Sequence, residues 1–524
     1  MKKKIYLFSK RFVPAIATEH VMNKKIVFLL LGLYLSCSLE AQTKVFKEVG
    51  EDISTEIKTI TQDNSLVGYL AFTRLEKADA DSFNYRVTIM DENLNDIGAV
   101  NFRQENLDLR TVSFEQNVLC LGYVQSPLVG GETVKSQKDY NKVKNEALSS
   151  HILVQFINLN GKVVNTYYRE VNLDMAAAYA NGRVFSPMSV HVMGYLKYGM
   201  QIRNIPNTGF TVFYGDDLKQ NLLLFNMKGE LTHEQEVTSF GDHFFLRVSA
   251  TDIYLLVKAN VHVPEGGYKL YVYSAKDLGN ENNFDLRDAS GDWLTVLSFD
   301  NDPATGDACI AGCIINPKRE LQFSTANDYS YIPYLGLFTL DLGGPDKDMH
   351  ANCSYWSDKK FSGISDDGLF TEKSFYVKYA TAFRDYSGNT IFAGTAVIET
   401  QTGADKFKLA DGVFVRQEPS GNLRLDNTIP CDETKYFGPS VILNTLDKKD
   451  FYKVLNPDTK TNYMIIDDVE NIYIYNVNAR KVMRTIQHKD GNVKINVYPA
   501  KEGHVMVSEF NRKEKYTRFS IEAL

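Results

Sequence analysis

The chain is poor in the residues and motifs that usually carry catalysis or hold a metal. It contains two tryptophans, six cysteines and nine histidines in 524 residues, and the histidines are scattered along the chain. The sequence has no phosphate-binding P-loop, no G-x-S-x-G elbow and no Cys-x-x-Cys pair, and no second histidine follows His233-Glu234 at metalloprotease spacing. It therefore assigns no catalytic residue and no metal site, and we expect no cofactor.

An excess of basic residues is also absent. Lysine and arginine number 58 against 65 aspartates and glutamates, which gives a formal net charge of −7. A protein dedicated to nucleic-acid binding shows the opposite balance, so this function class is excluded. Beyond the N-terminal region no apolar run approaches the roughly 20 residues that cross a bilayer as a helix, and we expect no transmembrane span.

The N-terminal region has the layout of an export signal. A short basic segment, Met22–Lys25, precedes an apolar run at residues 26–35 that is too short to span a bilayer comfortably. A region that ends in the small residue Ala41 follows this run. Basic, apolar and small residues in this order are typical of a secretory signal peptide, so the sequence predicts export.

The predicted signal peptide divides the chain into three parts. Residues 1–21 form an upstream extension from a misplaced start, residues 22–41 form the signal peptide, and the mature protein begins at or near Gln42. An alternative interpretation makes Cys37 a lipid-modified N-terminus, so that the protein is a lipoprotein. In both cases we expect a protein of the periplasm or one associated with the outer membrane.

Two cysteines lie close together in the sequence. Cys309 and Cys313 belong to the segment ACIAGCII, which has the composition of a strand. In an extended chain their Cα atoms would be about 13 Å apart, which is beyond the reach of a disulfide. We therefore expect two small buried hydrophobic side chains rather than a redox or metal pair.

Aromatic residues and hairpin signals are abundant. The chain has 30 tyrosines and 31 phenylalanines, and such side chains pack well on a pleated sheet. Residues 209–237 show a recurrent unit, in which three short strand-like segments are separated by turns at Gly215–Asp217 and Met227–Gly229. Glycine tolerates the positive φ that tight hairpins need, and hairpins of this type follow one another along most of the chain.

Seven of these hairpins contain a matching apolar strand. The strands are RVTIM, ILVQFI, LLLFN, YKLYVY, LGLFTL, GVFVR and NIYIYN. In several of them both alternate positions are apolar, as at Leu222–Phe225, which indicates a sheet covered on both faces. The blades of a β-propeller are covered in this way by their neighbours, and repetition of one unit favours the same fold. The sequence therefore predicts an all-β protein, a single β-propeller of about seven blades with long irregular loops over residues 45–524, with tandem β-sandwiches or a split propeller as the alternative.

Three segments depart from the strand pattern. Residues 130–150 are polar and rich in lysine, and we expect an exposed insertion with a short helix. Residues 48–62 are polar and weakly helical, and we expect a lead-in to the first strand. Residues 174–179, DMAAAY, predict a short helix that Asp174 would cap.

Two aspartate-rich segments carry carboxylates of the kind that calcium binds. Residues 300–307 nevertheless lack the spacing and the distal glutamate of an EF-hand loop. Residues 365–368 have the same character, and both segments end in or contain a glycine at a position where a β-turn needs one. We interpret both as turns and expect no metal there.

One concentration of aromatic residues supplies candidate binding residues. Loops at strand ends collect at the two faces of a propeller, where exposed rings can stack on sugars or anchor a peptide. The alternative role for such rings is packing between blades. The candidates, which flank a predicted strand, are Tyr329, Tyr331, Tyr334, Tyr355 and Trp356.

The signal peptide followed by Ala41-Gln42, together with the aromatic-rich irregular strands, resembles secreted proteins of the Bacteroidota. Many of those proteins are similar to uncharacterised propeller-like families. The resemblance rests on general style and on no specific motif. It implies a location in the cell envelope and assigns no functional residue.

Two functions fit the predicted fold. The one we favour is a non-catalytic envelope propeller that binds a protein or a glycan through its loop face. The alternative is a glycan-active hydrolase or lyase with carboxylates around the central channel. An enzyme should show convergent Asp, Glu, His or Arg side chains with perturbed pKa values lining one pocket, whereas a binding module should show an aromatic or apolar patch without such a cluster.

Overall fold

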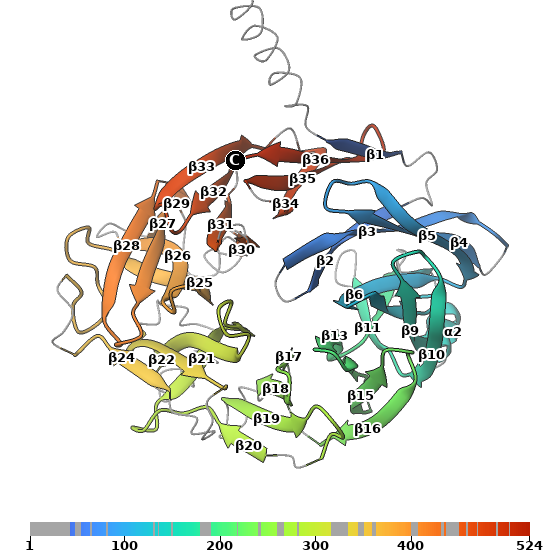
Figure 1. Cartoon of the computed structure of the whole chain (residues 1–524), viewed down its shortest axis with the longest axis horizontal. Helices are drawn as coiled ribbons and strands as arrows, with labels where there is room; N and C mark the ends of the chain where they lie inside the picture. Colours follow the sequence, from blue (N-terminus) through green and yellow to red (C-terminus); the bar gives the residue numbers. More distant parts are fainter. Residues whose placement is uncertain are drawn as a thin grey trace, which may run out of the picture.

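The computed structural model is an eight-bladed β-propeller, in which eight antiparallel sheets surround a central channel (Figure 1). The structure describes residues 42–47, 54–62, 65–79, 82–128, 132–134, 136–147, 150–178, 190–216, 218–238, 241, 243–258, 267–279, 282–315, 334–343, 351–358, 363–399, 407–430, 434–435, 450–456, 460–468, 470–488, 491–501 and 503–524. Within this part of the chain no helix is long and apolar enough to cross a membrane.

The blades follow one another along the chain, and in blades 1 to 7 the strands run in order from the channel outward. Blades 1 and 2 consist of β2 (Ser54–Gln62), β3 (Ser65–Lys77), β4 (Phe83–Asp91) and β5 (Asp96–Gln104), and of β6 (Leu107–Glu115), β7 (Val118–Gln125), β9 (Ser150–Asn158) and β10 (Val163–Val171). Blades 3 and 4 consist of β13 (Gly199–Ile205), β14 (Gly209–Gly215), β15 (Gln220–Asn226) and β16 (Leu231–Val237), and of β17 (His243–Val248), β18 (Asp252–Lys258), β19 (Tyr268–Ser274) and β20 (Asn282–Asp285).

The other blades repeat this pattern. Blade 5 consists of β21 (Trp293–Asn301), β22 (Ala308–Ile315), β23 (Gly336–Asp341) and β24 (Asn352–Tyr355). Blade 6 consists of β25 (Tyr376–Arg384), β26 (Thr390–Glu399), β27 (Phe407–Gln417) and β28 (Leu423–Ile429), and the short β29 (Thr434–Lys435) also pairs with β27. Blade 7 consists of β30 (Asp450–Asn456), β31 (Thr461–Asp467), β32 (Asn471–Asn476) and β33 (Lys481–Gln487).

Blade 8 closes the ring with strands from both ends of the chain. It consists of β34 (Val493–Pro499), β35 (His504–Asn511), β36 (Tyr516–Ala523) and, as its outermost strand, β1 (Thr43–Lys47). The Phe46 ring of β1 packs edge-on against Phe519 of β36 at 5.6 Å between centroids. Lys44 forms an ion pair with Asp96 of blade 1, so β1 also contacts the neighbouring blade.

The expected number of about seven blades differs from the observed eight because of this closure. Each of the seven matching strands in the sequence is the third strand of one of blades 1 to 7. The equivalent strand of blade 8 is β36, whose outer neighbour lies more than 450 residues away in the sequence. Blade 8 therefore lacks the local hairpin that joins the third and fourth strands in the other blades.

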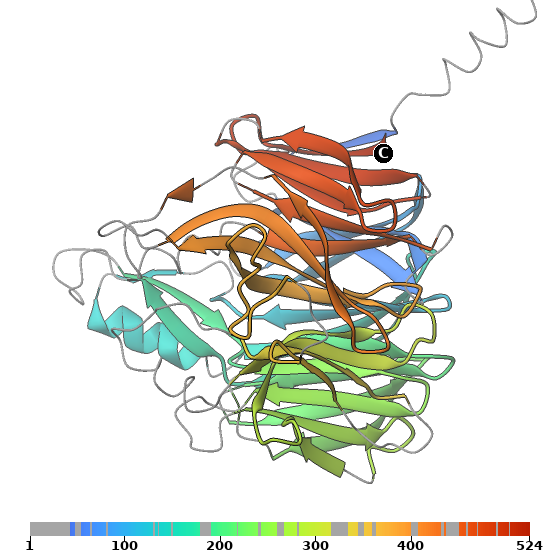
Figure 2. The ribbon, with the colours of Figure 1, turned by 90° about the vertical axis from the view of Figure 1, so that its left-hand side faces the viewer.

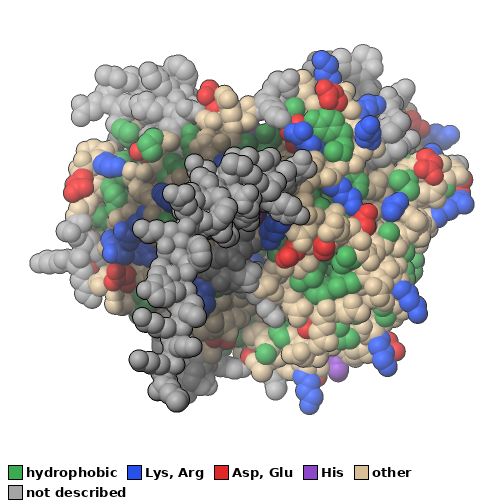
Figure 3. Space-filling view, turned by 45° about the horizontal axis from the view of Figure 1, so that its top comes forward, with side chains coloured by type: hydrophobic (Ala, Val, Ile, Leu, Met, Phe, Trp, Pro, Cys, Tyr) green, Lys and Arg blue, Asp and Glu red, His purple; other side chains and the backbone are tan. Residues whose placement is uncertain are grey.

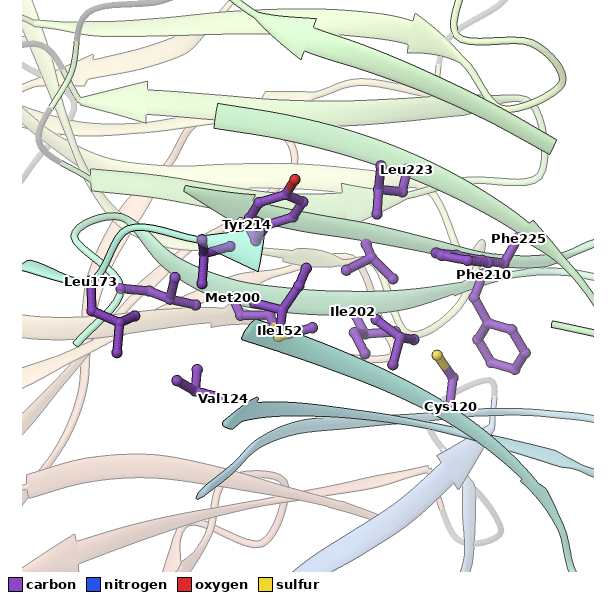
Figure 4. Packing of buried hydrophobic residues seen from close by; sticks show 14 of the residues in the cluster. Cys120, Val124, Ile152, Leu173, Met200, Ile202, Phe210, Tyr214, Leu223 and Phe225 are labelled. Atoms are coloured by element: carbon purple, nitrogen blue, oxygen red, sulfur yellow. The ribbon is translucent and has the colours of Figure 1, made fainter. Parts of the chain in front are cut away.

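Among the residues that the structure describes, the core consists of eight hydrophobic clusters, one between each pair of neighbouring blades. In β15, Leu223 packs in the cluster shared with blade 2, whereas Leu222 and Leu224 pack in the cluster shared with blade 4. Figure 4 shows the first of these clusters, in which Ile152 of blade 2 and Leu223 of blade 3 take part. All three leucines are buried, so the prediction of a strand covered on both faces is confirmed.

Additional elements project from one face of the ring. They are β8 (Glu132–Val134), α2 (Gln137–Ala147), β11 (Asp174–Ala178) and β12 (Val190–Tyr195), and the three strands form a small sheet of order β11-β12-β8 (Figure 2). The expected helix at residues 174–179 is wrong, because residues 174–178 pair with β12 in register from Asp174–Tyr195 to Ala178–His191. Alanines are compatible with either structure, and strand pairing decided between them here.

The expectation of a weakly helical lead-in at residues 48–62 is also wrong. Residues 54–62 form β2, the channel-side strand of blade 1. Ile57 and Ile60 of this strand are buried, and Ile57 packs in the cluster that joins blade 1 to blade 8. The many polar residues of this segment suggested a helix. In the structure they belong to a strand, one side of which faces the channel.

The direction of the strands defines two faces of the ring. Within a blade the strands are antiparallel, so the turns between first and second strands all lie on one face, here called the turn face. The connections between second and third strands, and those between successive blades, lie on the opposite face. The small sheet and α2 occupy two such connections, so we call this opposite face the insertion face (Figure 2).

Cys309 and Cys313 both lie in β22, and both are free thiols, which confirms the prediction that they form no disulfide. Cys313 is completely buried among the side chains between blades 5 and 6. Burial raises the pKa of the Cys309 thiol to about 12. Both cysteines therefore act as small core residues and not as reactive thiols.

The contact of β1 with β36 predicts a measurable cost when it is weakened. Replacing the half-buried Phe46 by alanine should lower the free energy of unfolding by about 1–3 kcal/mol, because it removes the ring that packs on Phe519. Val45, on the same strand, is 48% exposed, so Val45→Ala should leave stability nearly unchanged. Chemical denaturation of the two variants measures the difference, and equal midpoints would show that β1 does not hold blade 8 through Phe46.

Candidate binding site in the central channel

A cavity of about 620 Å³ occupies the end of the central channel at the turn face. Its walls come from the first strands of six blades, namely β2, β6, β13, β17, β21 and β30, and from the turns that follow several of them. Hydroxyl groups of Thr59, Thr61, Ser113 and Ser249 line it together with charged side chains. A volume of this size falls in the range of small-molecule and cofactor sites.

The turn after β21 forms one wall of this cavity. Asp302 Oδ1 accepts hydrogen bonds from the backbone N–H groups of Ala304 at 2.7 Å and Thr305 at 3.2 Å. Gly306 has φ of +81°, a conformation that glycine adopts without strain. The segment is thus the turn that its sequence suggests, and the Asp302 carboxylate is used by the turn itself and by an ion pair with Arg384.

Asp300, just before this turn, is the centre of an ion-pair network. Its Oδ1 accepts from Arg247 Nη2 at 3.1 Å, and its Oδ2 accepts from Lys453 Nζ at 2.6 Å. Burial by itself would raise the pKa of the Asp300 carboxyl, but the charges of Lys453 and Arg247 outweigh that effect and hold the pKa below its usual value. Asp300 is therefore a fixed carboxylate that joins blade 5 to blades 4 and 7 across the channel.

Two arginines meet beside this network. Arg203 Nε at 3.2 Å and Arg247 Nη1 at 2.8 Å donate to the same acceptor, the backbone oxygen of Leu246. Arg203 Nη1 also donates to the backbone oxygen of Ile202 at 2.9 Å. Burial and the neighbouring charge of Arg247 lower the pKa of Arg203 to about 9, with a partial offset from Asp300. Among the described residues no carboxylate forms an ion pair with Arg203.

Asp300 and Arg203 converge in this cavity and the pKa of each is lowered, which is one feature expected of an enzyme. Among the described residues that line it, the carboxylates are Asp300 and Asp307, and there is no histidine, cysteine or tyrosine. A general acid needs a raised pKa, whereas that of Asp300 is lowered. The arrangement can hold and orient a polar or charged ligand.

Three of the aromatic candidates, Tyr334, Tyr355 and Trp356, lie elsewhere, on the insertion-face side of blade 5. Tyr329 and Tyr331 lie outside the described residues. Tyr334 and Trp356 are buried in the cluster between blades 5 and 6, where Trp356 Nε1 donates to the backbone oxygen of Tyr334. Lys378 Nζ donates to Tyr334 Oη at 3.2 Å. These two rings therefore pack between blades, with little surface left for a ligand.

Tyr355 is only half-buried and points away from that cluster. Its hydroxyl donates to Asp288 and, at 3.3 Å, to Asp292. Burial and the hydrogen bond to Asp288 raise the pKa of Tyr355. The structure thus brings Tyr334 and Trp356 together and keeps Tyr355 apart from them, and a binding role for the five aromatic residues stays a prediction.

Sequence reasoning did not single out Arg203, Arg247 or Lys453. The sequence of β17, HFFLRV, carries no alternation of apolar and polar residues, and only the burial pattern of the strand in the structure places Arg247 on the channel side. Recognising the three as one group requires knowing that β13, β17 and β30 face the same channel. Only the three-dimensional arrangement of the blades shows this.

Comparison with known proteins adds a partial family match and several structural neighbours. Residues 22–129 match a family of unknown function (DUF6770), a stretch that includes blade 1 and the first two strands of blade 2. No curated protein matches the sequence.

Three solved structures illustrate the structural neighbours. The C-terminal WD40 domain of Sif2 is 10% identical, with a TM-score of 0.42, and the match covers 91% of this chain and 99% of that one. The WD40 domain of SCAP from fission yeast is 8% identical, with a TM-score of 0.39 and coverage of 92% and 98%. The polysaccharide lyase Uly1 is 11% identical, with a TM-score of 0.40 and coverage of 79% and 90%.

Proposed function

We propose that the protein is an exported, non-catalytic propeller of the cell envelope that binds a glycan at the turn-face end of its channel. The observation that carries this proposal is the cavity of about 620 Å³, which is lined by hydroxyl and charged side chains fixed by ion pairs. Sites for small polar ligands have this form, with a few precisely placed polar groups. The lowered pKa of Asp300 argues against the alternative of a hydrolase or lyase that uses a channel carboxylate as its acid.

Export to the periplasm or the outer membrane rests on the N-terminal sequence. The basic and apolar segments after Met22 have the form of a signal peptide, and the family match also begins at Met22. The backbone oxygen of Gln42 accepts from the N–H of Ile521 in blade 8 at 2.9 Å, so Gln42 already belongs to the propeller. Cleavage before Gln42 would therefore leave β1 intact, which supports this position for the mature N-terminus.

The polar lining of the cavity favours a glycan over a protein partner. Stable protein interfaces centre on buried aromatic or apolar anchors, and the largest apolar patches of a surface often mark them. On the face shown in Figure 3, basic and acidic side chains are interspersed and the visible hydrophobic side chains form small separate groups. The polar cavity is instead suited to a ligand rich in hydroxyl groups.

A tryptophan placed at either face tests the position of the site. Ala250 lies on an exposed turn and lines the cavity, so Ala250→Trp should block entry and reduce glycan binding at least about tenfold. Leu218 is 69% exposed and lies in the second-to-third-strand turn of blade 3, on the insertion face, so Leu218→Trp should bind as the parent does. Binding is measured on a glycan array and by pulldown from an envelope extract, with melting curves to show that both variants fold.

Each alternative has its own result in this experiment. Binding that survives Ala250→Trp and is lost in Leu218→Trp would move the site to the insertion face. Capture of a protein with no glycan on the array would replace the glycan by a protein partner. Shortened glycan products after incubation with the parent protein would show catalysis, and the non-catalytic proposal would be wrong.

A further inference from the structure

We propose that the channel cavity recognises an oxyanion on its ligand, a carboxylate, sulfate or phosphate group, and that Arg203, Arg247 and Lys453 bind it. The inference rests on the proposed function for the ligand being a glycan, and it deepens that function by giving the glycan an acidic group. Nothing in the composition suggests this, because the chain as a whole is acidic, with a net charge of −7.

The first argument is the contact between two like charges. The guanidinium groups of Arg203 and Arg247 share the backbone oxygen of Leu246, so they lie side by side on the cavity wall. Two cations so close repel each other, and the repulsion is strong where water is partly excluded. A carboxylate or a bound anion normally compensates such a pair, and here Asp300 contacts Arg247 and not Arg203.

The second argument is the number of charges in the lining. Arg203, Arg247 and Lys453 stand against two carboxylates, Asp300 and Asp307. Asp300 is shared by Arg247 and Lys453, and Asp307 lies on the turn after β21, where no described cation pairs with it. The cavity therefore has more positive than negative side chains, and the cation that lacks a carboxylate partner is Arg203.

The third argument is that the donors are already oriented. Two nitrogens of Arg203 are held by the carbonyl oxygens of Leu246 and Ile202, and no described residue accepts from its Nη2. Lys453 uses one N–H for Asp300 and has two further donors. A guanidinium fixed in this way loses little entropy when it binds an oxyanion, and arginine is the side chain best matched to carboxylate, sulfate and phosphate.

The protonation of Arg203 is compatible with this role. Burial and the charge of Arg247 lower its pKa to about 9, so the group still carries its charge at neutral pH. An anion beside it would favour the charged form further.

The test uses simple charged sugars on the full-length mature protein. Glucuronate, glucose 6-sulfate and glucose 6-phosphate are compared with glucose and with sodium chloride at constant ionic strength, by calorimetry and thermal shift. We expect at least one charged sugar to bind and to raise the melting temperature by about 3 °C near saturation, whereas glucose does not. The charged sugar that binds identifies the group as a carboxylate, a sulfate or a phosphate.

Matched variants tie this binding to the cavity. Arg203→Gln should weaken binding at least about tenfold, and Arg203→Lys should restore part of it. Arg169 forms an ion pair with Glu234 between the outer strands β10 and β16, so Arg169→Gln serves as the control and should bind as the parent does. If Arg203→Gln does not fold, Lys453→Gln takes its place with the same expectation.

Two outcomes would overturn the inference: no charged sugar binds better than glucose, or Arg203→Gln binds as tightly as Arg169→Gln. The results also separate it from the proposed function. Channel binding of neutral glycans alone would leave the proposed function standing and remove the oxyanion. Binding of charged sugars that depends on Arg203, with no response on the glycan array, would keep the oxyanion site and remove the glycan.

Discussion

Replacing Leu223 by aspartate should lower the free energy of unfolding by at least about 4 kcal/mol, because it removes a buried side chain and places an unpaired carboxylate in the core. Leu223 is completely buried between blades 2 and 3. Leu222→Asp should be equally severe, because Leu222 is completely buried between blades 3 and 4. Thermal and denaturant melts of both variants measure the effect.

The control for this pair lies on the outer strand of the same blade. Leu231 begins β16 and is 37% exposed, so Leu231→Asp should change stability by no more than about 1 kcal/mol. A sheet with one solvent-exposed face would tolerate aspartate at one of the two positions, Leu222 or Leu223, and not at the other. Neighbouring side chains of a strand point to opposite faces, so only one of the two would be buried. A melt of either variant within a degree or two of the parent would therefore contradict the blade packing described here.

The continuous apolar runs of the sequence are the strands that both neighbouring blades cover. The third strand of blade 3, β15, has the burial of a core strand along most of its length, so its sequence is a continuous apolar run. The outer strand β16 reads LTHEQEV and is exposed along most of its length, and it carries no such signal. The first strand β13 alternates buried residues with polar residues toward the channel, as at Ile202 and Arg203.

The same distinction explains the two segments whose structure was not predicted correctly. Residues 54–62 form a first strand, and the polar residues on its channel side obscured the strand pattern. Residues 174–178 form an edge strand of the small sheet, and only its pairing with β12 fixes its conformation. For residues 174–178 the partner strand β12 lies further along the chain, and a local pattern carries no record of that contact.

The candidate site was less predictable than the fold for a geometric reason. Arg203, Arg247, Asp300 and Lys453 come from blades 3, 4, 5 and 7, and up to 250 residues separate them in the sequence. Their spacing in the sequence depends on the lengths of the intervening strands and loops, so no sequence motif marks them as one site. Of the aromatic candidates at strand ends, Tyr334 and Trp356 turn inward to fill the interface between blades 5 and 6.

Raising the pH from 9 to above 12 should unfold the protein in a cooperative step. Burial raises the pKa values of Tyr214 and Tyr254 to about 12, and it also raises those of Tyr69, Tyr123 and Tyr334. A tyrosine whose pKa is higher in the folded than in the unfolded state contributes stability that is fully present below about pH 10 and is lost as the pH rises through the folded value. When folding raises a pKa by 1, the corresponding free energy of stabilisation is about 1.4 kcal/mol. The free energy lost when several such tyrosines ionise therefore exceeds the modest free energy of unfolding of a folded protein.

The phenolate absorbance and the circular dichroism, followed together through an alkaline titration, measure this effect. The buried tyrosines should ionise only as the β-sheet signal disappears. Tyr123 is completely buried and donates a long hydrogen bond of 3.4 Å to Gln155, so Tyr123→Phe removes one ionising group at small cost and should raise the pH of unfolding. Tyr168 is 48% exposed, and Tyr168→Phe should leave that pH unchanged. Full ionisation of all tyrosines near pH 10 with the sheet signal intact would contradict the burial of these rings between the blades.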